Sequence, residues 1–498
     1  MQRTHMSRIT PRFQGTIGIK SPYSGVSPVS RHSLRVLVSA RAGTKTALRP
    51  YSSSASGSSP IKPKASWAYS FLFIALGALL SDQYKSYRSS SITTGVKEED
   101  PSPKAPKDPI TTQLNTESSV YTDDANSVAS YHVTRLEASS PCEDRYVHGE
   151  LSASEGSVLQ GPWYAWAVFD GHAGSQTAAL LTKRLLPAVQ DALSSLDLDS
   201  ADDRAVSETV SKAFVALDDD IVKGAVEAVR AGVPYHEQIA KIMPAYTGSW
   251  LSSASRTQTA SGTNATSLSV DQTGSNDDEI ARINAEHPGE SGIVKGGRVL
   301  GLMVSRGFGD GRWKWDLDFQ SEIKTKFELG FNPLSPAKYE VKTPPYLSAE
   351  PVVTTTQLDR KRPSFLIMAS DGFWDRVSTE QAVDLIGGWL NSREMAQQVP
   401  LGRDTKSSSR AVVEDSRGPF SLDKYGWDKP GFRFSRDRES FQDANNAAVH
   451  LLRNALGGNY VEMVEANLVA EPPFARNSRD DITVQVIFFD PSKLQLPT

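Results

Sequence analysis

The sequence predicts an α+β fold, in which a layered β-sandwich is flanked by helices. Three runs rich in β-branched, aromatic and other apolar residues are strand candidates, at 163–169, 365–369 and 482–489. Apolar residues at helical spacing follow the first run and indicate an amphipathic helix. The turns between strands and helices do not recur at the intervals of βαβ units, so a sandwich is favoured over a doubly wound sheet.

The helix after the first strand is the clearest of the helical predictions. Its apolar residues lie three and four positions apart, which places them on one face of a helix: Ala178, Leu181, Leu185, Val189 and Leu193. Two further helices are predicted at 205–222 and 375–390. Together with the strands, they indicate one large domain over 121–490, with a highly charged surface insertion at 402–440.

The N-terminal residues 1–64 contain Arg, Lys, Ser and Thr but no Asp or Glu. This composition is typical of a mitochondrial transit peptide. A basic arm that binds nucleic acid or anionic lipid is the alternative, and the complete absence of carboxylates favours the transit peptide.

An apolar run from Trp67 to Leu80 follows, within a segment at 65–84. It is shorter than the ~20 residues that comfortably span a bilayer, but Trp67 and Tyr84 lie at its ends, where aromatic rings favour the interface. The charged leader is too long for a secretory signal, and the polar flanks offer no core for a buried helix. We therefore expect a short membrane segment, followed by a disordered Ser/Pro/Lys linker at 85–120.

Acidic residues lie at one end of each predicted strand. Asp170 ends the first strand, Asp371 follows the second and Asp480 precedes the third. If the third strand is antiparallel to the others, these carboxylates meet at one edge of the sheet. Their mutual repulsion would be relieved by a divalent cation, and oxygen ligands favour Mg²⁺ or Mn²⁺. The lone Cys142 excludes a disulfide within the chain and a cysteine-rich metal site.

The order of the motifs is more specific than any one of them. The chain contains, in this order, EDR, DGHAG, SVDQTG, GGRVLGLMVSRGFGD, ASDGFWD and SRDDITV. Over 121–490 this series resembles the metal-dependent protein phosphatase (PPM, or type 2C) family. The spacer FNPLSPAKYEVKTPPYLSAEPVV and the HPGE segment are most similar to its mitochondrial pyruvate dehydrogenase phosphatase branch. The resemblance implies a β-sandwich flanked by helices, with a two-metal centre at one edge.

The resemblance also implies roles for the acidic residues. Asp170 would bridge two Mg²⁺ or Mn²⁺ ions, the carbonyl of Gly171 would bind one of them, and Asp371 and Asp480 would hold the other. A water activated by the ions would attack the phosphorus of phosphoserine or phosphothreonine in line.

Four further residues receive roles by the same resemblance. Glu143 and Asp144 would complete the metal site, directly or through water. Asp375 could bind a third ion. His172 is the candidate acid that protonates the leaving group, since imidazole titrates in the required range.

The chain departs from the family pattern at two places. The family often has a phosphate-binding Arg shortly before the Glu-Asp pair, but only Arg135 is near, so this role is unassigned. The family also has a strand beginning Ser-Gly-Ser/Thr, a hairpin containing GDSR, and then Leu-Ser-x-Asp. Here 261–263 runs almost directly into 268–271, and no GDSR occurs. Part of the central sheet is therefore predicted to be missing between Gly262 and Leu268, as in a truncated gene model or a splice form.

Three functions follow as alternatives. The first is an active mitochondrial serine/threonine phosphatase held at the inner membrane, with a phosphoprotein such as pyruvate dehydrogenase as its substrate. The second is a catalytically impaired, phosphatase-like regulatory or binding protein, which the missing segment favours. The third is a two-metal nuclease, but no basic groove with interleaved aromatic residues accompanies the motifs, so no nucleic-acid partner is expected. The leader and apolar segment leave the matrix and the intermembrane space as alternative locations.

Overall fold

The computed structural model describes much of the chain between residues 109 and 490, together with two short strands nearer the N-terminus. The described residues are 36–38, 97–98, 109–122, 128–151, 163–196, 201–251, 254–258, 264–327, 330–335, 338–356, 358, 363–398 and 445–490.

Two antiparallel sheets form the centre of the molecule. The larger has seven strands in the order β2-β3-β4-β15-β14-β8-β9, and the smaller has four in the order β12-β7-β6-β5. The larger sheet contains β2 (Lys97–Glu98), β3 (Ser118–Thr122), β4 (Val128–Leu136), β8 (Ala254–Gln258), β9 (Asn264–Ser267), β14 (Ser364–Ala369) and β15 (Ile482–Phe489). The smaller contains β5 (Arg145–Leu151), β6 (Trp163–His172), β7 (Gly248–Leu251) and β12 (Phe308–Gly309).

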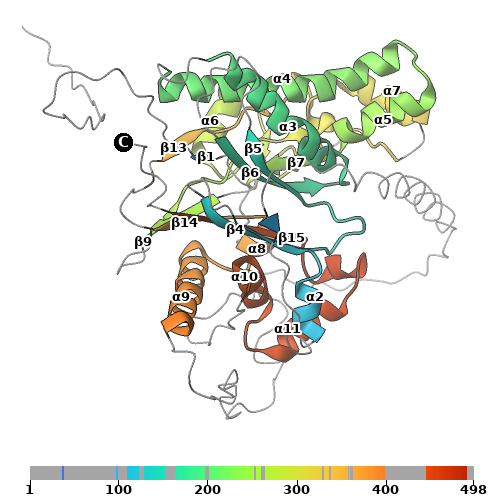
Figure 1. Cartoon of the computed structure of the whole chain (residues 1–498). Coiled ribbons are helices and arrows are strands. Elements are labelled where there is room, and N and C mark those ends of the chain that lie inside the picture. The colour runs from blue at the N-terminus through green and yellow to red at the C-terminus, as the bar shows by residue number, and fades with distance from the viewer. Residues whose placement is uncertain are drawn as a thin grey trace, which may run out of the picture.

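Helices cover the outer face of each sheet, which gives a four-layered sandwich (Figure 1). Those on the smaller sheet are α3 (Gln176–Ser194), α4 (Asp203–Arg230) and α5 (Tyr235–Tyr246). Those on the larger sheet are α2 (Pro109–Leu114), α8 (Asp371–Trp374), α9 (Thr379–Gln398), α10 (Ala447–Leu456) and α11 (Val461–Val469). Apolar side chains fill the space between the sheets, among them Val133, Val168 and Ile487. Each sheet therefore buries both of its faces, as a sandwich requires.

The three predicted strands are confirmed as β6, β14 and β15. Because β15 is antiparallel to β14, the end of β14 and the start of β15 lie at the same edge. The expectation of a single sheet is wrong, however, since β6 belongs to the smaller sheet. A run that is apolar on both faces does not specify its sheet. The side chain of Gln485 in β15 reaches the carbonyl of Ala167 in β6 at 3.0 Å and joins the two sheets.

The helix predictions are confirmed in kind and differ in their boundaries. Helix α3 buries the five residues of its predicted stripe. Helix α4 is longer than 205–222, and the side chain of Asp202 caps its N-terminus by accepting from the Ala205 nitrogen at 2.7 Å. The helix predicted at 375–390 corresponds to α9, which begins later, at Thr379; the short α8 ends before it, at Trp374.

The folded domain begins before the predicted residue 121. Residues 109–114 form α2, whose Ile110 and Leu114 are buried against the larger sheet, and β3 pairs with β4. The prediction of a disordered linker over all of 85–120 is therefore wrong at its C-terminal end. The two apolar residues lie four apart and face the core in a helix, even though Ser and Thr surround them.

Other predicted segments fall outside the described residues. The transit leader 1–64 is described only at β1 (Val36–Val38), which pairs with β13 (Thr354–Thr356). The membrane segment 65–84 and the insertion 402–440 are not described. In the part of the chain that the structure describes, no helix combines the length and hydrophobicity needed to cross a bilayer.

A smaller unit packs beside α5 and around its own apolar core, which includes Ile283, Trp313 and Tyr346. It contains α6 (Asp277–Glu286), β10 (Val294–Lys295), β11 (Arg298–Val299) and η1 (Gly311–Trp313), while the buried apolar residues of the following α7 (Leu317–Phe327) pack into the core of α3, α4 and α5. The short η3 (Phe474–Asn477) precedes β15.

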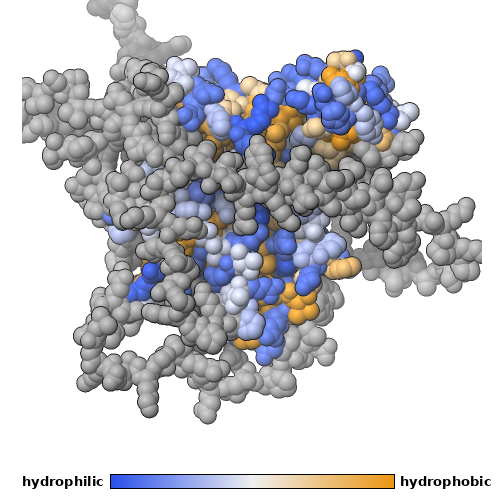
Figure 2. All heavy atoms as spheres, turned by 45° about the vertical axis from the view of Figure 1, so that its right-hand side comes forward, coloured by the Kyte–Doolittle hydropathy of each residue, from blue (hydrophilic) through white to orange (hydrophobic). Residues whose placement is uncertain are grey.

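The coloured surface in Figure 2 is mainly hydrophilic, with small separate hydrophobic areas.

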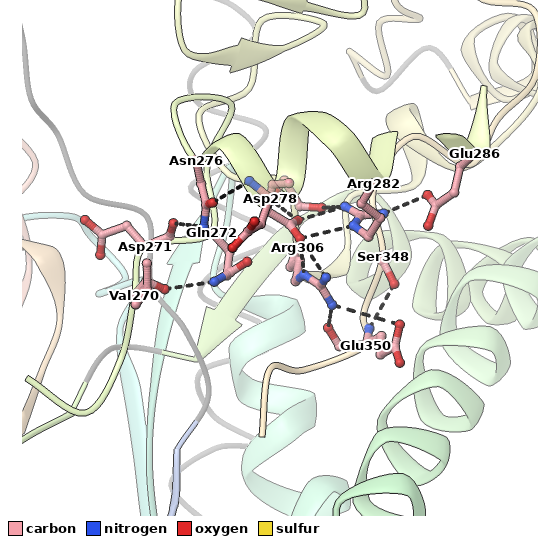
Figure 3. A network of polar contacts seen from close by, with 12 residues as sticks. Val270, Asp271, Gln272, Asn276, Asp278, Arg282, Glu286, Arg306, Ser348 and Glu350 are labelled. Atoms are coloured by element: carbon pink, nitrogen blue, oxygen red, sulfur yellow. Dashed lines mark hydrogen bonds and ion pairs between the residues drawn. The ribbon is translucent and has the colours of Figure 1, made fainter. Parts of the chain in front are cut away.

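A buried carboxylate holds this smaller unit together. Glu279 in α6 accepts hydrogen bonds from Arg282 and Arg306, and from the hydroxyl of Ser305. Figure 3 shows these two Arg side chains and their neighbours. The guanidinium of Arg306 also donates to the carbonyl of Glu350 at 2.6 Å. The network thus joins α6 to the segments on either side of α7.

A strand that starts with glycine and serine, as in the family motif, lies before residues 261–263. It is β7, which begins with Gly248 and Ser249 and pairs with the end of β6. Residues 261–263, to which the sequence analysis assigned this motif, are outside the described residues. On their two sides β8 and β9 pair as a hairpin at the edge of the larger sheet. The gap predicted between Gly262 and Leu268 stays a prediction; the chain leaves the smaller sheet after Leu251, since β8 already belongs to the larger sheet, so a further segment there would extend β7.

Candidate active site

The candidate active site begins where the two sheets meet. Asp170 lies near the end of β6 and is buried, and Asp371 is the first residue of α8, directly after β14. The backbone nitrogen of Asp371 donates to Oδ2 of Asp170 at 3.1 Å. Two of the predicted carboxylate residues, 201 positions apart in the chain, are thus brought into direct contact.

Gly171 brings a second acidic segment to this point. A Cβ at Gly171 would lie 2.3 Å from the carbonyl oxygen of Glu143, so only glycine allows the 143–144 backbone to pack against β6. The carboxylate of Glu143 accepts a hydrogen bond from the Gly174 nitrogen at 2.5 Å. The backbone of Glu143 therefore lies against Gly171, the residue after Asp170, and the metal-binding roles of Glu143 and Asp144 stay predictions.

Burial makes ionisation of these two acids costly. It raises the pKa of Glu143, and the backbone of Gly174 only partly opposes this. Burial, and next the neighbouring Asp481 carboxylate, raises the pKa of Asp144, although hydroxyls of Ser370 and Thr483 lie nearby. Oδ2 of Asp144 is buried without a hydrogen-bond partner among the described residues.

The two adjacent aspartates before β15 have different surroundings. The side chain of Asp480 is 37% exposed and forms an ion pair with Arg476. The Asp481 carboxylate is buried and accepts from the backbone nitrogens of Ala138, Ser139 and Glu143. Asp480 thus faces solvent at the site, while Asp481 holds the 138–143 segment in place. Asp481 was not among the residues predicted from the sequence, where the Asp-Asp pair was its only signal.

Asp375 lies one helical turn after Asp371, at the C-terminus of α8. Its backbone nitrogen donates to the carbonyl of Asp371 at 2.8 Å. Asp371 and Asp375 therefore lie on the same short helix. The role of Asp375 as a ligand of a third metal ion stays a prediction.

His172 is held from three directions. Its Nε2 lies 2.7 Å from Oδ1 of the buried Asp310, and the Trp250 ring stacks on it at a centroid distance of 4.6 Å. A Cβ at Gly248 would lie 2.2 Å from the His172 ring. Burial lowers the pKa of His172, but the charge and hydrogen bond of Asp310, together with the charges of Glu143 and Asp371, outweigh it, so the net shift is upward. Asp310 was not predicted from the sequence, although it is the last residue of the quoted GGRVLGLMVSRGFGD motif.

The nearby arginines differ in their availability. Arg135 is tied to the Glu117 carboxylate at 2.6 Å and to the carbonyl of Asp144 at 3.1 Å. It acts as a support for the acidic segment. Arg476, from η3, is 44% exposed and lies beside Asp480 and Glu143.

The acidic side chains gathered around Asp170 have the chemistry that a hard divalent cation requires. All the gathered side chains offer oxygen, and a buried oxygen of Asp144 has no hydrogen-bond partner in the described chain. In the described ranges, no three His, Cys, Asp or Glu side chains are close enough together to form a metal-binding group as they stand.

Comparisons with known proteins agree with this geometry. A family model described as "Protein phosphatase 2C" matches residues 251–407. A protein phosphatase 2C homolog of Schizosaccharomyces pombe is 33% identical over 422 residues, which cover 79% of this chain and 87% of the relative. The chain belongs to the protein phosphatase 2C family. The predicted resemblance, the α+β class and the assignment to the protein serine/threonine phosphatases are confirmed.

Other members of the family are similar over different lengths. The mitochondrial pyruvate dehydrogenase phosphatase 1 of Saccharomyces cerevisiae is 30% identical over 414 residues, covering 76% of this chain and 71% of the relative. Its human counterpart is 31% identical over 242 residues, covering 45% of this chain and 41% of the relative. A solved phosphatase from a pathogenic strain of Toxoplasma gondii has 17% identity and a TM-score of 0.39, and the match covers 77% of this chain and 98% of that one.

Proposed function

We propose that this protein is an active, metal-dependent phosphatase that hydrolyses phosphoserine and phosphothreonine in a mitochondrial phosphoprotein. The contact between the Asp371 nitrogen and the Asp170 carboxylate carries the proposal, because it joins two motif residues from different sheets at one point. Pyruvate dehydrogenase is the first candidate substrate, supported by the names of the yeast and human relatives.

The acidic residues would hold Mg²⁺ or Mn²⁺. The proposed ligands are Asp170, the carbonyl of Gly171, Asp371 and Asp480, with Glu143 and Asp144 bound directly or through water, and Asp375 at a third ion. When bound, the ions would supply an activated water for in-line attack on phosphorus. His172, oriented beside this group, would give its proton to the leaving serine or threonine oxygen.

A catalytically impaired, phosphatase-like regulatory protein is the second candidate. The absence of GDSR from the sequence favours it. So does the pairing of β6, since 163–168 pairs with β5 on one side and β7 begins to pair only at Phe169. In this alternative the chain would bind phosphoproteins or a partner phosphatase without turnover.

The deciding experiment is an assay of purified protein with a phosphothreonine peptide and Mn²⁺. Activity should disappear with EDTA and return with Mn²⁺ or Mg²⁺. Asp170→Asn should lower kcat at least about a hundredfold, whereas Asp220→Asn, an exposed aspartate on α4 paired with Arg184, should not. Mn²⁺ should also raise the melting temperature of the wild type and not of Asp170→Asn. Near wild-type turnover by Asp170→Asn would contradict the assignment of Asp170 to the active site.

The mitochondrial location rests on the acid-free leader and on the relatives. Import of the full chain into isolated mitochondria would test it. Protease protection in intact mitochondria and in mitoplasts would then distinguish the matrix from the intermembrane space. Extraction by carbonate would contradict the proposed anchor at 65–84.

A further inference from the structure

The orientation of His172 depends on a residue outside the metal-site motifs. Asp310 is 1% exposed, and its Oδ1 lies 2.7 Å from Nε2 of His172. Trp250 stacks on the ring, and the absence of a side chain at Gly248 leaves room for it. A Cβ at Gly248 would also lie 2.4 Å from Oδ1 of Asp310. The imidazole therefore has one defined plane and one defined hydrogen bond.

Asp310 is itself fixed by its backbone. It adopts a left-handed conformation with φ of 55°, which is uncommon for a residue other than glycine. Its nitrogen donates to the carbonyl of Thr247 at 2.9 Å, in the residue before β7. A strained conformation that surrounding contacts maintain is frequent at functional sites.

Helix α4 supports the same turn from the other side. The buried Asp218 accepts from the Gly309 nitrogen at 2.8 Å and pairs with Nζ of Lys314 at 2.6 Å. Lys314 also donates to the carbonyl of Gly307 at 2.8 Å. These contacts clamp the residues on both sides of Asp310, so the position of its carboxylate is set before any substrate binds.

The bond at Nε2 leaves the other ring nitrogen available. Nδ1 of His172 is buried and has no hydrogen-bond partner among the residues that the structure describes. A buried nitrogen without a partner is costly, and a bound group that accepts from it removes that cost. A carboxylate at one nitrogen orients a histidine so that the other faces the reaction.

We propose that Asp310 is the positioning residue that holds His172 with Nδ1 directed at the leaving oxygen of the substrate. This inference rests on the proposed function. As water forms its bond to phosphorus, the bond from phosphorus to the serine or threonine oxygen breaks, and its electron pair stays on that oxygen. The oxygen takes the proton from Nδ1 of His172. The ring keeps its Nε2 proton, which is hydrogen-bonded to Asp310 throughout.

The test compares substrates whose leaving groups need a proton to different degrees. A phosphothreonine peptide releases an alkoxide and needs the proton, whereas p-nitrophenyl phosphate releases a stable phenolate and needs it little. Asp310→Ala and Asp310→Asn should lower kcat for the peptide by about tenfold or more, with KM within about twofold. The loss on p-nitrophenyl phosphate should be several-fold smaller. His172→Ala should show the same selectivity, and the double variant should lose little more than His172→Ala.

A matched control separates positioning from stability. Glu279→Gln also removes a buried carboxylate charge, but in the smaller unit and away from His172. It should not change the ratio of the two substrate rates. Equal losses on both substrates in the Asp310 variants would overturn the proposal. If those variants fail to fold, Asp218→Asn, which loosens the clamp, should show the selective loss in weaker form, and an unchanged ratio would contradict it.

A spectroscopic measurement does not depend on turnover. In ¹⁵N-histidine-labelled protein, two-bond ¹H–¹⁵N correlations report which ring nitrogen carries the proton. The His172 signal, identified by its absence in His172→Ala, should show protonated Nε2 in the wild type and lose this preference in Asp310→Ala. Inactivity of the wild type on both substrates would contradict the proposed function alone. An unchanged His172 signal in Asp310→Ala would contradict the positioning role even in an inactive protein.

Discussion

The carboxylate of Asp481 accepts a hydrogen bond from the backbone nitrogen of Glu143 at 2.7 Å. The same carboxylate accepts from the nitrogens of Ala138 and Ser139. It therefore ties the start of β15 to the segment that carries Glu143 and Asp144. Its neighbour Asp480 makes none of these contacts and pairs instead with the exposed Arg476. Asp481 therefore has a structural role, and Asp480 is the one of the two that we propose as a metal ligand.

The first prediction contrasts these two aspartates. Asp481→Ala would leave three backbone nitrogens without acceptors, so its free energy of unfolding should fall by about 2–4 kcal/mol. Asp480→Ala should lower stability by less than about 1 kcal/mol, because its ion pair is exposed, yet it should lose most of the metal-dependent activity. Urea unfolding and peptide turnover would measure both. Similar stability losses in the two variants would contradict the division of roles.

Part of this site could be predicted from the sequence. The apolar strand patterns placed Asp170 and Asp371 at strand ends, and the family resemblance added Glu143, Asp144 and His172. The distinction between Asp480 and Asp481 could not be predicted, because it depends on which of two neighbouring side chains faces a loop 340 residues away. Asp310 was missed for a similar reason. Its contact with His172 spans 138 positions and depends on a left-handed turn.

The fold shows the same limits. Strong apolar runs predicted the strands β6, β14 and β15, but a strand pattern does not name its neighbours, so the division into two sheets required the structure. The assignment of the family's Gly-Ser strand to 261–263 falls outside the described residues and stays a prediction. Strand β7 begins with the same residue types, and the packing of Gly248 against His172 could be seen only in the structure.

The second prediction concerns the buried Glu279. Burial raises its pKa, but hydrogen bonds from Arg282, Arg306 and Ser305 outweigh this and lower the pKa to about 2. Glu279→Gln should reduce the free energy of unfolding by about 2–4 kcal/mol, because two arginines lose their shared charge partner. Glu286→Gln, which removes an exposed partner of the same Arg282, should cost less than about 1 kcal/mol. Equal costs in chemical denaturation would show that burial of the network has no energetic consequence.

The third prediction is a loss of stability in mild acid. Burial, and next the charge of Arg393, lowers the pKa of His132 to about 3, and burial lowers the pKa of His148 to about 4. The unfolded chain binds protons at these groups below pH ~6.5 while the folded chain does not. Stability is therefore full above that pH and falls as the pH drops toward 4, by about 2 kcal/mol for each histidine at pH 5.

Urea unfolding from pH 7 to pH 5 would measure this loss. In His132→Gln the slope of stability against pH should be smaller, since one of the two groups is removed. His236→Gln, at a site where the side chain is 83% exposed, serves as the matched control and should keep the wild-type slope. An identical slope in all three proteins would assign the acid sensitivity to other groups.

The last prediction concerns a segment added after Leu251, where β7 ends. Strand β6 pairs with β5 from Trp163 to Phe169, but with β7 only from Phe169 to His172. In the described structure, residues 163–168 therefore have a strand neighbour on one side only. Each cross-strand pair of side chains contributes roughly 0.2–1 kcal/mol, and a typical domain has only about 5–15 kcal/mol of stability. A GDSR-containing segment inserted after Leu251 would lengthen β7 beside these residues. We expect the longer form to melt at a higher temperature and to turn over the phosphothreonine peptide faster.

The control for this prediction is an insertion of equal length made of Gly and Ser, which cannot continue the sheet and should not stabilise the protein. A cooperative, high-temperature melt together with full activity in the present chain would show that β6 needs no second neighbour and that the hairpin is dispensable.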